Sequence, residues 1–235
     1  MNTAEQYAAT IDRLKAMYNP VNRAGMARYG INPQNALGIP MTVVRPLAKT
    51  LGGNQALSEM FWQSGIHEAR LLATLVGVPA QVTQEQMERW VAGFDSWDIC
   101  DQCCMNLFAL TPYAWAKAFE WGRREPEFVK RAGFVLIACL AVKDKKAEDS
   151  RFEQYFDLIS EGSTDSRNFV RKAVNWALRH IGKRNQSLNR KAVTLAWEIK
   201  KIDSSAARWI AGDAIRELTG DAVQSRLKKR AEGAK

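Results

Sequence analysis

Helical periodicity dominates this chain of 235 residues and most limits the folds open to it. Apolar residues recur at spacings of three and four along many stretches, whereas the strict alternation of a β-strand is nearly absent. These stretches are 4–18, 41–52, 54–64, 66–76, 84–94, 97–110, 112–123, 126–143, 150–161, 166–182, 187–201 and 204–219. Residues 19–40 are less regular and predict a short helix between loops. The sequence therefore predicts an all-α protein.

Two all-α architectures accommodate short helices joined in hairpins: a globular bundle and an α-solenoid. Helix pairs recur roughly every 30–40 residues, which is the spacing of HEAT-type repeats. No repeat motif aligns cleanly, so the periodicity favours the solenoid while the bundle stays open. One helix of each pair would line the concave surface of a solenoid, and that shape suits a long ligand such as duplex DNA. We expect residues 1–235 to form a single domain of this kind.

The apolar runs of the chain are short. The run GFVLIACLAV at 133–142 falls well below the roughly 20 residues that cross a bilayer. The first residues, MNTAEQYAATIDRL, lack the apolar centre of a secretory signal. We therefore expect a cytoplasmic protein with no membrane partner.

The four cysteines raise the question of metal or redox chemistry, because three of them form a Cys-x-x-Cys-Cys cluster. They are Cys100, Cys103, Cys104 and Cys139. No second Cys or His pair stands at ligand spacing, and the two histidines, His67 and His180, are isolated. We predict buried free thiols that act as small hydrophobic side chains, and no metal site.

Positive charge is concentrated in one segment of a chain whose net charge is +9. Residues 166–197 contain no Asp or Glu. The cations of this segment are Arg167, Arg171, Lys172, Arg179, Lys183, Arg184, Arg190 and Lys191. Such a concentration on a folded segment indicates a polyanionic partner, most often nucleic acid. The alternative is the solvated face of a basic protein.

Trp176 lies inside this basic segment but outside its expected apolar face. On a helical wheel the buried arc is formed by Val170, Ala173, Val174, Ala177, Leu178 and Ile181. Lys172, Arg179 and Lys183 lie opposite that arc, with Trp176 about 40° further round. A large aromatic side chain on such a face needs another surface to cover it. Either the next repeat covers Trp176, or it contacts a sugar or base among cations that hold phosphates.

A second unusual segment is FDSWDICDQC at 94–103. Trp97 and Asp101 are four residues apart and therefore share a helix face. Asp98 suits the first turn, where a carboxylate interacts favourably with the helix dipole. Asp101 lies beyond that turn, and the dipole accounts for it less well.

Lys130 and Arg131 form a third feature, at the start of FVKRAGFVLIACLAV. That helix is apolar nearly all round, so it should be buried along its length and meet solvent only near its beginning. The two cations there serve either solubility or the same ligand as the basic segment.

The motifs SWDICD, KRAGFVLIACLA and NFVRKAVNWALRHIGKRN, in this order, resemble the AlkD-like family of DNA alkylation repair glycosylases. Upstream, MARYGI, RPLAK and FWQSGIHEARLLA are similar to the same family, so the resemblance extends from about residue 20 to 220. It implies an α-α superhelix of HEAT-like repeats that forms a C-shaped solenoid with a concave basic groove. It also implies hydrolysis of the N-glycosidic bond of N3-alkyladenine and N7-alkylguanine in duplex DNA, with no metal or organic cofactor.

By this resemblance Trp97 and Trp176 look like the aromatic residues that contact the deoxyribose of the lesion. Asp101 looks like the catalytic carboxylate, and Arg131 like the basic residue that holds the backbone beside it. An alkylated purine is cationic and departs readily, so the developing charge on the sugar is what a carboxylate and indole faces would stabilise. The DNA contacts expected are Lys130, Arg171, Lys172, Arg179, Lys183 and Arg184.

Three hypotheses follow. The first is a monomeric, monofunctional glycosylase whose partner is double-stranded DNA containing alkylated bases. The second is a non-catalytic HEAT-repeat protein that recognises damaged, bent or branched DNA. The third is a scaffold for an acidic protein, with Trp176 as the interface anchor. Base release and the effect of Asp101→Asn separate the first two, and failure to bind duplex DNA at low salt would favour the third.

Overall fold

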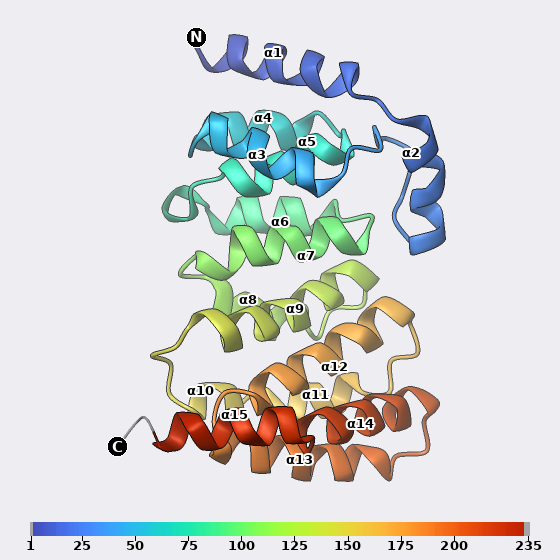
Figure 1. The fold of residues 1–235 in the computed structure, drawn as a ribbon, viewed down its shortest axis with the longest axis vertical. Helices are drawn as coiled ribbons and strands as arrows, with labels where there is room; N and C mark the ends of the chain where they lie inside the picture. Colours follow the sequence, from blue (N-terminus) through green and yellow to red (C-terminus); the bar gives the residue numbers. More distant parts are fainter. Residues whose placement is uncertain (1, 233–235) are drawn as a thin grey trace. The chain divides into compact units, whose positions relative to one another are not determined.

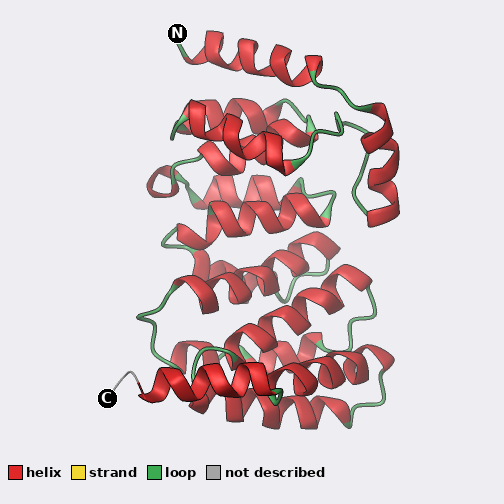
Figure 2. Ribbon diagram, in the orientation of Figure 1, coloured by secondary structure: helices red, strands yellow, loops and turns green. Residues whose placement is uncertain are grey.

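The computed structural model describes residues 2–232, and within that range helices are joined by short loops and turns without a β-strand. Figure 1 labels the helices along the chain, and Figure 2 shows the same ribbon coloured by secondary structure. The all-α prediction is confirmed. Packing divides the chain into two compact units, Met1–Tyr113 and Ala114–Lys235. None of the described helices is long and apolar enough to span a membrane.

Unit 1 contains seven α-helices within its described residues. They are α1 (Thr3–Ala16), α2 (Pro20–Met26), α3 (Met41–Leu51), α4 (Gln55–Gln63), α5 (His67–Val76), α6 (Gln84–Ala92) and α7 (Trp97–Asn106). Helix α5 packs against α3, α4 and α7. The rings of Trp62 and Trp90 stack with their centroids 4.1 Å apart, and Phe94 meets Trp62 edge-on. Phe94, the last residue of this aromatic core, lies three positions before Trp97, where α7 begins.

Unit 2 contains eight α-helices within its described residues. They are α8 (Ala114–Trp121), α9 (Glu127–Lys143), α10 (Ser150–Glu153), α11 (Phe156–Gly162), α12 (Asn168–Gly182), α13 (Gln186–Lys200), α14 (Ser205–Leu218) and α15 (Asp221–Glu232). Helix α12 packs against α9, α13 and α14.

Helix α9 is buried on all sides over most of its length, as its apolar sequence predicts. Its close contact with α8 depends on Gly133, where an added Cβ would lie 2.3 Å from the backbone nitrogen of Gly122. Only glycine lets two helix backbones approach so closely.

The predicted helices are confirmed in number and order over most of the chain, with three differences. The prediction of a single helix over 97–110 is wrong, because α7 ends at Asn106 and a 3₁₀ turn, Phe108–Leu110, follows it after Leu107 leaves helical geometry. The prediction of a single helix over 150–161 is wrong, because the chain forms two helices, α10 and α11, separated by Gln154 and Tyr155. Tyr155 turns into the core there, stacks on Trp115 and donates its hydroxyl proton to the Trp115 carbonyl at 2.9 Å. Helix α15 is an addition to the predicted set. It buries only Val223 and Leu227, which gives it a weak apolar stripe.

Candidate functional site

In unit 1, α7 carries the two sequence-predicted residues Trp97 and Asp101. Trp97 is the first residue of the helix and is half-buried, and Asp101 lies one turn further along. The Asp101 side chain is buried, with 6% of its surface exposed. A carboxylate is rarely buried without a functional or structural reason, since burial removes its hydration. The predicted sharing of one helix by Trp97 and Asp101 is confirmed.

The segment before α3 fixes the start of α7. The indole Nε1 of Trp97 donates to the carbonyl oxygen of Tyr29 at 2.8 Å. The hydroxyl of Ser96 accepts from the backbone N–H of Asn32 at 2.9 Å, and the Asn32 side chain donates to Asp95 at 2.9 Å. These bonds set both the helix start and the plane of the Trp97 ring. The sequence carried no signal for Tyr29, because its backbone makes the contact.

A buried carboxylate holds this segment in place. Glu68 on α5 is fully buried and accepts three consecutive backbone N–H bonds, from Leu37 at 2.8 Å, Gly38 at 2.7 Å and Ile39 at 3.0 Å. Gly38 has φ +77°, and a Cβ there would lie 2.3 Å from the carbonyl oxygen of Asn19. The turn therefore requires glycine, and the three bonds satisfy the charge of Glu68.

Asp98 occupies the first turn of α7, as predicted, and also pairs with His67. The His67 Nε2 and Asp98 Oδ2 atoms are 2.8 Å apart. Burial lowers the pKa of His67, but the hydrogen bond to Asp98 and the charges of Asp98, Glu68 and Asp95 outweigh burial and raise it above its usual value. His67 thus links α5 to the helix that carries Trp97 and Asp101.

In unit 2, Lys130 and Arg131 lie near the start of α9 and join it to the start of α12. Arg131 is buried, with 5% of its surface exposed, and its Nη1 donates to the carbonyl oxygen of Phe169 at 2.6 Å. The Lys130 Nζ lies 3.4 Å from Asp165. Burial raises the pKa of Asp165, but hydrogen bonds from Arg167 and the charges of Arg167 and Lys130 lower it below its usual value overall.

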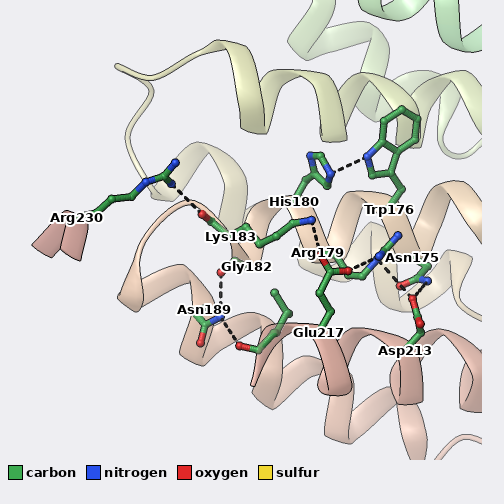
Figure 3. Close-up of polar contacts among 11 residues, drawn as sticks. Asn175, Trp176, Arg179, His180, Gly182, Lys183, Asn189, Asp213, Glu217 and Arg230 are labelled. Carbon is green, nitrogen blue, oxygen red and sulfur yellow. Dashed lines mark hydrogen bonds and ion pairs between the residues drawn. The ribbon is translucent and has the colours of Figure 1, made fainter. Parts of the chain in front are cut away.

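Trp176 lies on α12 outside the core, as the helical wheel predicts. It is half-buried, whereas its neighbours Val174 and Leu178 are fully buried. Its Nε1 donates to Nε2 of His180 at 2.8 Å, and the two rings meet at 85° (Figure 3).

His180 is therefore a positioning partner for Trp176 that its isolation in the sequence did not reveal. Burial, followed by the charges of Lys183 and Arg179, lowers the pKa of His180 to about 4, against the opposing charge of Glu217. A neutral ring carries one proton, and in the tautomer with that proton on Nδ1 the Nε2 atom can accept from the indole.

The basic run on α12 meets carboxylates from α14. Arg179 forms an ion pair with Glu217, and Lys183 Nζ lies 2.7 Å from the same carboxylate (Figure 3). Asp213 accepts from Asn175 at 2.7 Å and lies 3.6 Å from Arg179. Burial raises the pKa of Glu217, but the hydrogen bonds from Lys183 and Arg179 lower it overall. The segment has no acid of its own, yet the fold supplies two from another helix.

The other predicted cations differ in how they are used. Arg184 donates to the carbonyl oxygens of Ala141 at 2.8 Å, Asp144 at 2.9 Å and Ala147 at 3.1 Å, and these bonds fix its guanidinium against the end of α9 and the loop that follows. Arg171 lies over the Trp209 ring, 4.6 Å from its centroid. Lys172 is exposed, and among residues 2–232 its side chain makes no hydrogen bond or ion pair.

The cysteines are free and buried, as predicted. Burial raises the pKa of Cys103 well above its usual value, so the thiol stays protonated and unreactive. Within the described part of the chain, no group of three or more His, Cys, Asp or Glu side chains could hold a metal ion.

Comparisons with known proteins bear on this arrangement. The sequence model of the family described as DNA alkylation repair enzyme matches residues 10–218. No curated protein matches the chain. Among solved structures, it is similar to a member of "a new family of proteins related to the HEAT-like repeat DNA glycosylases with affinity for branched DNA structures", with a TM-score of 0.74 and 19% identity over 91% of this chain and 96% of that one. This likeness confirms the predicted HEAT-like repeat fold.

Two further solved structures are less similar. One is an engineered protein, with a TM-score of 0.37 and 15% identity over 75% of this chain and 90% of that one. The other is a designed armadillo repeat protein in complex with the peptide (KR)4, with a TM-score of 0.36 and 12% identity over 82% of this chain and 91% of that one. Neither score is high enough to support an argument.

Proposed function

The chain belongs to the DNA alkylation repair enzyme family, and from this premise we propose that it is a monofunctional DNA glycosylase. Its substrate is duplex DNA that carries N3-alkyladenine or N7-alkylguanine, and its reaction is hydrolysis of the N-glycosidic bond without a cofactor. We further propose that it acts as a cytoplasmic monomer on DNA bound in a basic groove of a C-shaped solenoid. The buried carboxylate of Asp101, one turn after Trp97, is the observation that carries this proposal.

The chemistry follows from the charge of the substrate. The alkylated purine is cationic, so the glycosidic electron pair leaves with the base and neutralises it. Positive charge then develops on the sugar, as in glycoside hydrolysis generally. In our proposal Asp101 stabilises that charge and orients a water molecule, whose oxygen bonds to C1′ while its proton passes to the carboxylate or to solvent.

The tryptophans are proposed to pack against deoxyribose. An indole N–H lies in the plane of its ring, so a hydrogen bond at that edge sets the plane and leaves the ring faces for another contact. Tyr29 provides the acceptor for Trp97, and His180 provides it for Trp176. The electron-rich faces would favour a sugar that carries positive charge.

The cations are proposed to neutralise DNA phosphates. Lys172 is exposed and makes no contact within residues 2–232 that would compete for its charge. Arg179 and Lys183 would contact a phosphate while they stay paired with Glu217, which already orders both side chains. Arg131 is proposed to hold the DNA backbone through its guanidinium. The remaining proposed contacts are Lys130, Arg171 and Arg184.

A base-release assay tests the proposal. Wild-type protein is expected to release 7-methylguanine or 3-methyladenine from methylated duplex DNA under single-turnover conditions. Asp101→Asn should lower that rate by about 10²–10⁴-fold, the range for a general acid or base, while duplex binding persists. Asp12→Asn makes the same chemical change at an exposed site on α1 and should release base at the wild-type rate. Folded wild-type protein that releases no base would refute the proposal.

A second candidate is a non-catalytic protein that binds branched or bent DNA, favoured by the description of the structurally similar protein as having affinity for branched DNA structures. It predicts tighter binding to a four-way junction than to a linear duplex of equal length. It also predicts no base release and equal junction binding by wild type and Asp101→Asn. The same two proteins thus separate the candidates.

A further inference from the structure

Unit 2 contains a large cavity at the C-terminal end of α12. Its volume is about 1050 Å³, at the upper end of the range for ligand sites. Three parts of the unit line it: the end of α9 with the loop that follows, the end of α12, and the segment from the end of α14 into α15. From α15 it receives Arg226 and Arg230, which follow the family-matched residues 10–218.

Charged side chains, rather than apolar ones, distinguish this cavity. Its cations are Lys145, Lys183, Arg184, Arg216, Arg226 and Arg230, and its acids are Asp149, Glu217 and Asp221. The lining thus carries an excess of positive charge. The pKa of His180, which also lines the cavity, is lowered to about 4 by burial and by the charges of Lys183 and Arg179. A positive environment favours an anionic ligand.

Two of the three acids of the lining already have partners. Glu217 pairs with Arg179 and Lys183, and Asp149 accepts from Asn185 at 2.7 Å. Asp221 lies in the first turn of α15, where the helix dipole favours a carboxylate.

Two cations of the lining, in contrast, remain available. Lys145 and Arg226 are exposed, and over residues 2–232 their side chains make no hydrogen bond or ion pair. Arg230 instead donates to the carbonyl oxygens of Lys183 at 3.1 Å and Arg184 at 3.3 Å, which attaches α15 to the end of α12.

The cavity begins close to Trp176. His180 is common to both places, since it accepts from the indole and lines the cavity. Figure 3 shows Trp176, His180 and Lys183 along α12, with Arg230 beyond them. Lys183 lies seven positions after Trp176, or about 10 Å further along the helix.

We propose that this cavity binds phosphodiester groups of DNA to one side of the nucleotide at Trp176, with Lys145 and Arg226 as the principal contacts. The inference rests on the proposed function in that its ligand is duplex DNA. It extends the DNA-binding surface beyond the family-matched residues onto α15. It requires neither base release nor any particular lesion.

Salt-dependent binding tests this site. We would measure the affinity of Lys145→Ala/Arg226→Ala for a long undamaged duplex by fluorescence anisotropy across a salt series. Each lost phosphate contact lowers the slope of log K against log salt by about 0.9, so the slope should fall by about 1.8. With the electrostatic contribution referred to ~1 M salt, the same slope change weakens binding by about 60-fold at ~0.1 M salt. The control is Lys228→Ala/Lys229→Ala, which removes two exposed α15 cations that do not line the cavity and should keep the wild-type slope.

The outcomes separate this site from the proposed reaction, because base release by wild type is measured in parallel. Equal slopes for the two double variants would overturn the cavity site, whether or not base is released. Absence of duplex binding by wild type would overturn it as well. A lower slope for the cavity variant alone supports the site, and if wild type then releases no base, only the glycosylase proposal fails.

Discussion

The burial of His180 beside two cations gives the protein a pH-dependent stability whose sign can be predicted. Burial, then the charges of Lys183 and Arg179, lower the pKa of His180 from 6.5 to about 4, and Glu217 opposes this only in part. The folded state thus disfavours the protonated ring, while the unfolded chain accepts a proton near pH 6.5. The contribution is complete above pH 6.5 and is lost as the pH falls towards 4.

The size of the effect follows from the same pKa. For a histidine whose pKa falls from 6.5 to about 4 on folding, lowering the pH from about 7 to about 4.5 removes about 2.4 kcal/mol of unfolding free energy. The ring of His180 is half-buried, and solvent screens part of its interaction with the neighbouring cations. We therefore expect a loss of about 1–2 kcal/mol from this residue.

Urea unfolding of wild type and His180→Gln at pH 7 and near pH 4.5 measures this loss. The glutamine amide oxygen can accept from the Trp176 indole but does not titrate in this range. Asp165 and Glu217, whose pKa values are lowered, also lose stabilisation in acid, but they do so in both proteins. Wild type should lose about 1–2 kcal/mol more than the variant. Equal losses, or a larger loss in the variant, would refute the reasoning.

Two further predictions concern the core. Gly38→Ala should lower the unfolding free energy by about 2–4 kcal/mol, because a Cβ at φ +77° is strained and would lie 2.3 Å from the Asn19 carbonyl oxygen. Urea unfolding measures it against Gly212→Ala, where an added Cβ meets nothing within 4 Å and should be neutral or stabilising. Thiol reagents at mildly alkaline pH should leave the native cysteines unmodified, because all four are buried and burial raises the pKa of Cys103. Reaction in the native state as fast as in urea would contradict this burial.

Most of the fold could be predicted because helical periodicity is a local property of the sequence. Helices α9 and α12 lie close to their predicted bounds, since each has a long apolar pattern. The break between α10 and α11 could not be predicted in the same way. It depends on Tyr155 reaching Trp115, 40 residues earlier in the chain. Helix α15 could not be predicted for a local reason, since its two buried residues form too short an apolar pattern to be recognised in the sequence.

The candidate site was predictable to the extent that its side chains share a helix. A wheel places Trp176 outside the core because the apolar arc of α12 is defined by that helix alone. It cannot show that Glu217, 38 residues from Arg179, pairs with it. Nor can it show that Tyr29 holds the Trp97 ring, because a backbone carbonyl has no signature in the sequence.

The two tryptophans share one feature that their sequence contexts do not. Trp97 donates to a peptide carbonyl and Trp176 to a neutral histidine, so each indole N–H meets an uncharged acceptor. A cation at that position would offer no acceptor and would oppose positive charge near the ring, whereas an acceptor's lone pair reinforces the negative potential of the ring face. Burial, and after it the charges of Lys183 and Arg179, lower the pKa of His180 and so keep the ring neutral. The positive charge that would attract DNA phosphates thus adds to burial in keeping the acceptor of Trp176 neutral, and one cluster on α12 would serve both phosphate binding and the proposed contact with a cationic sugar.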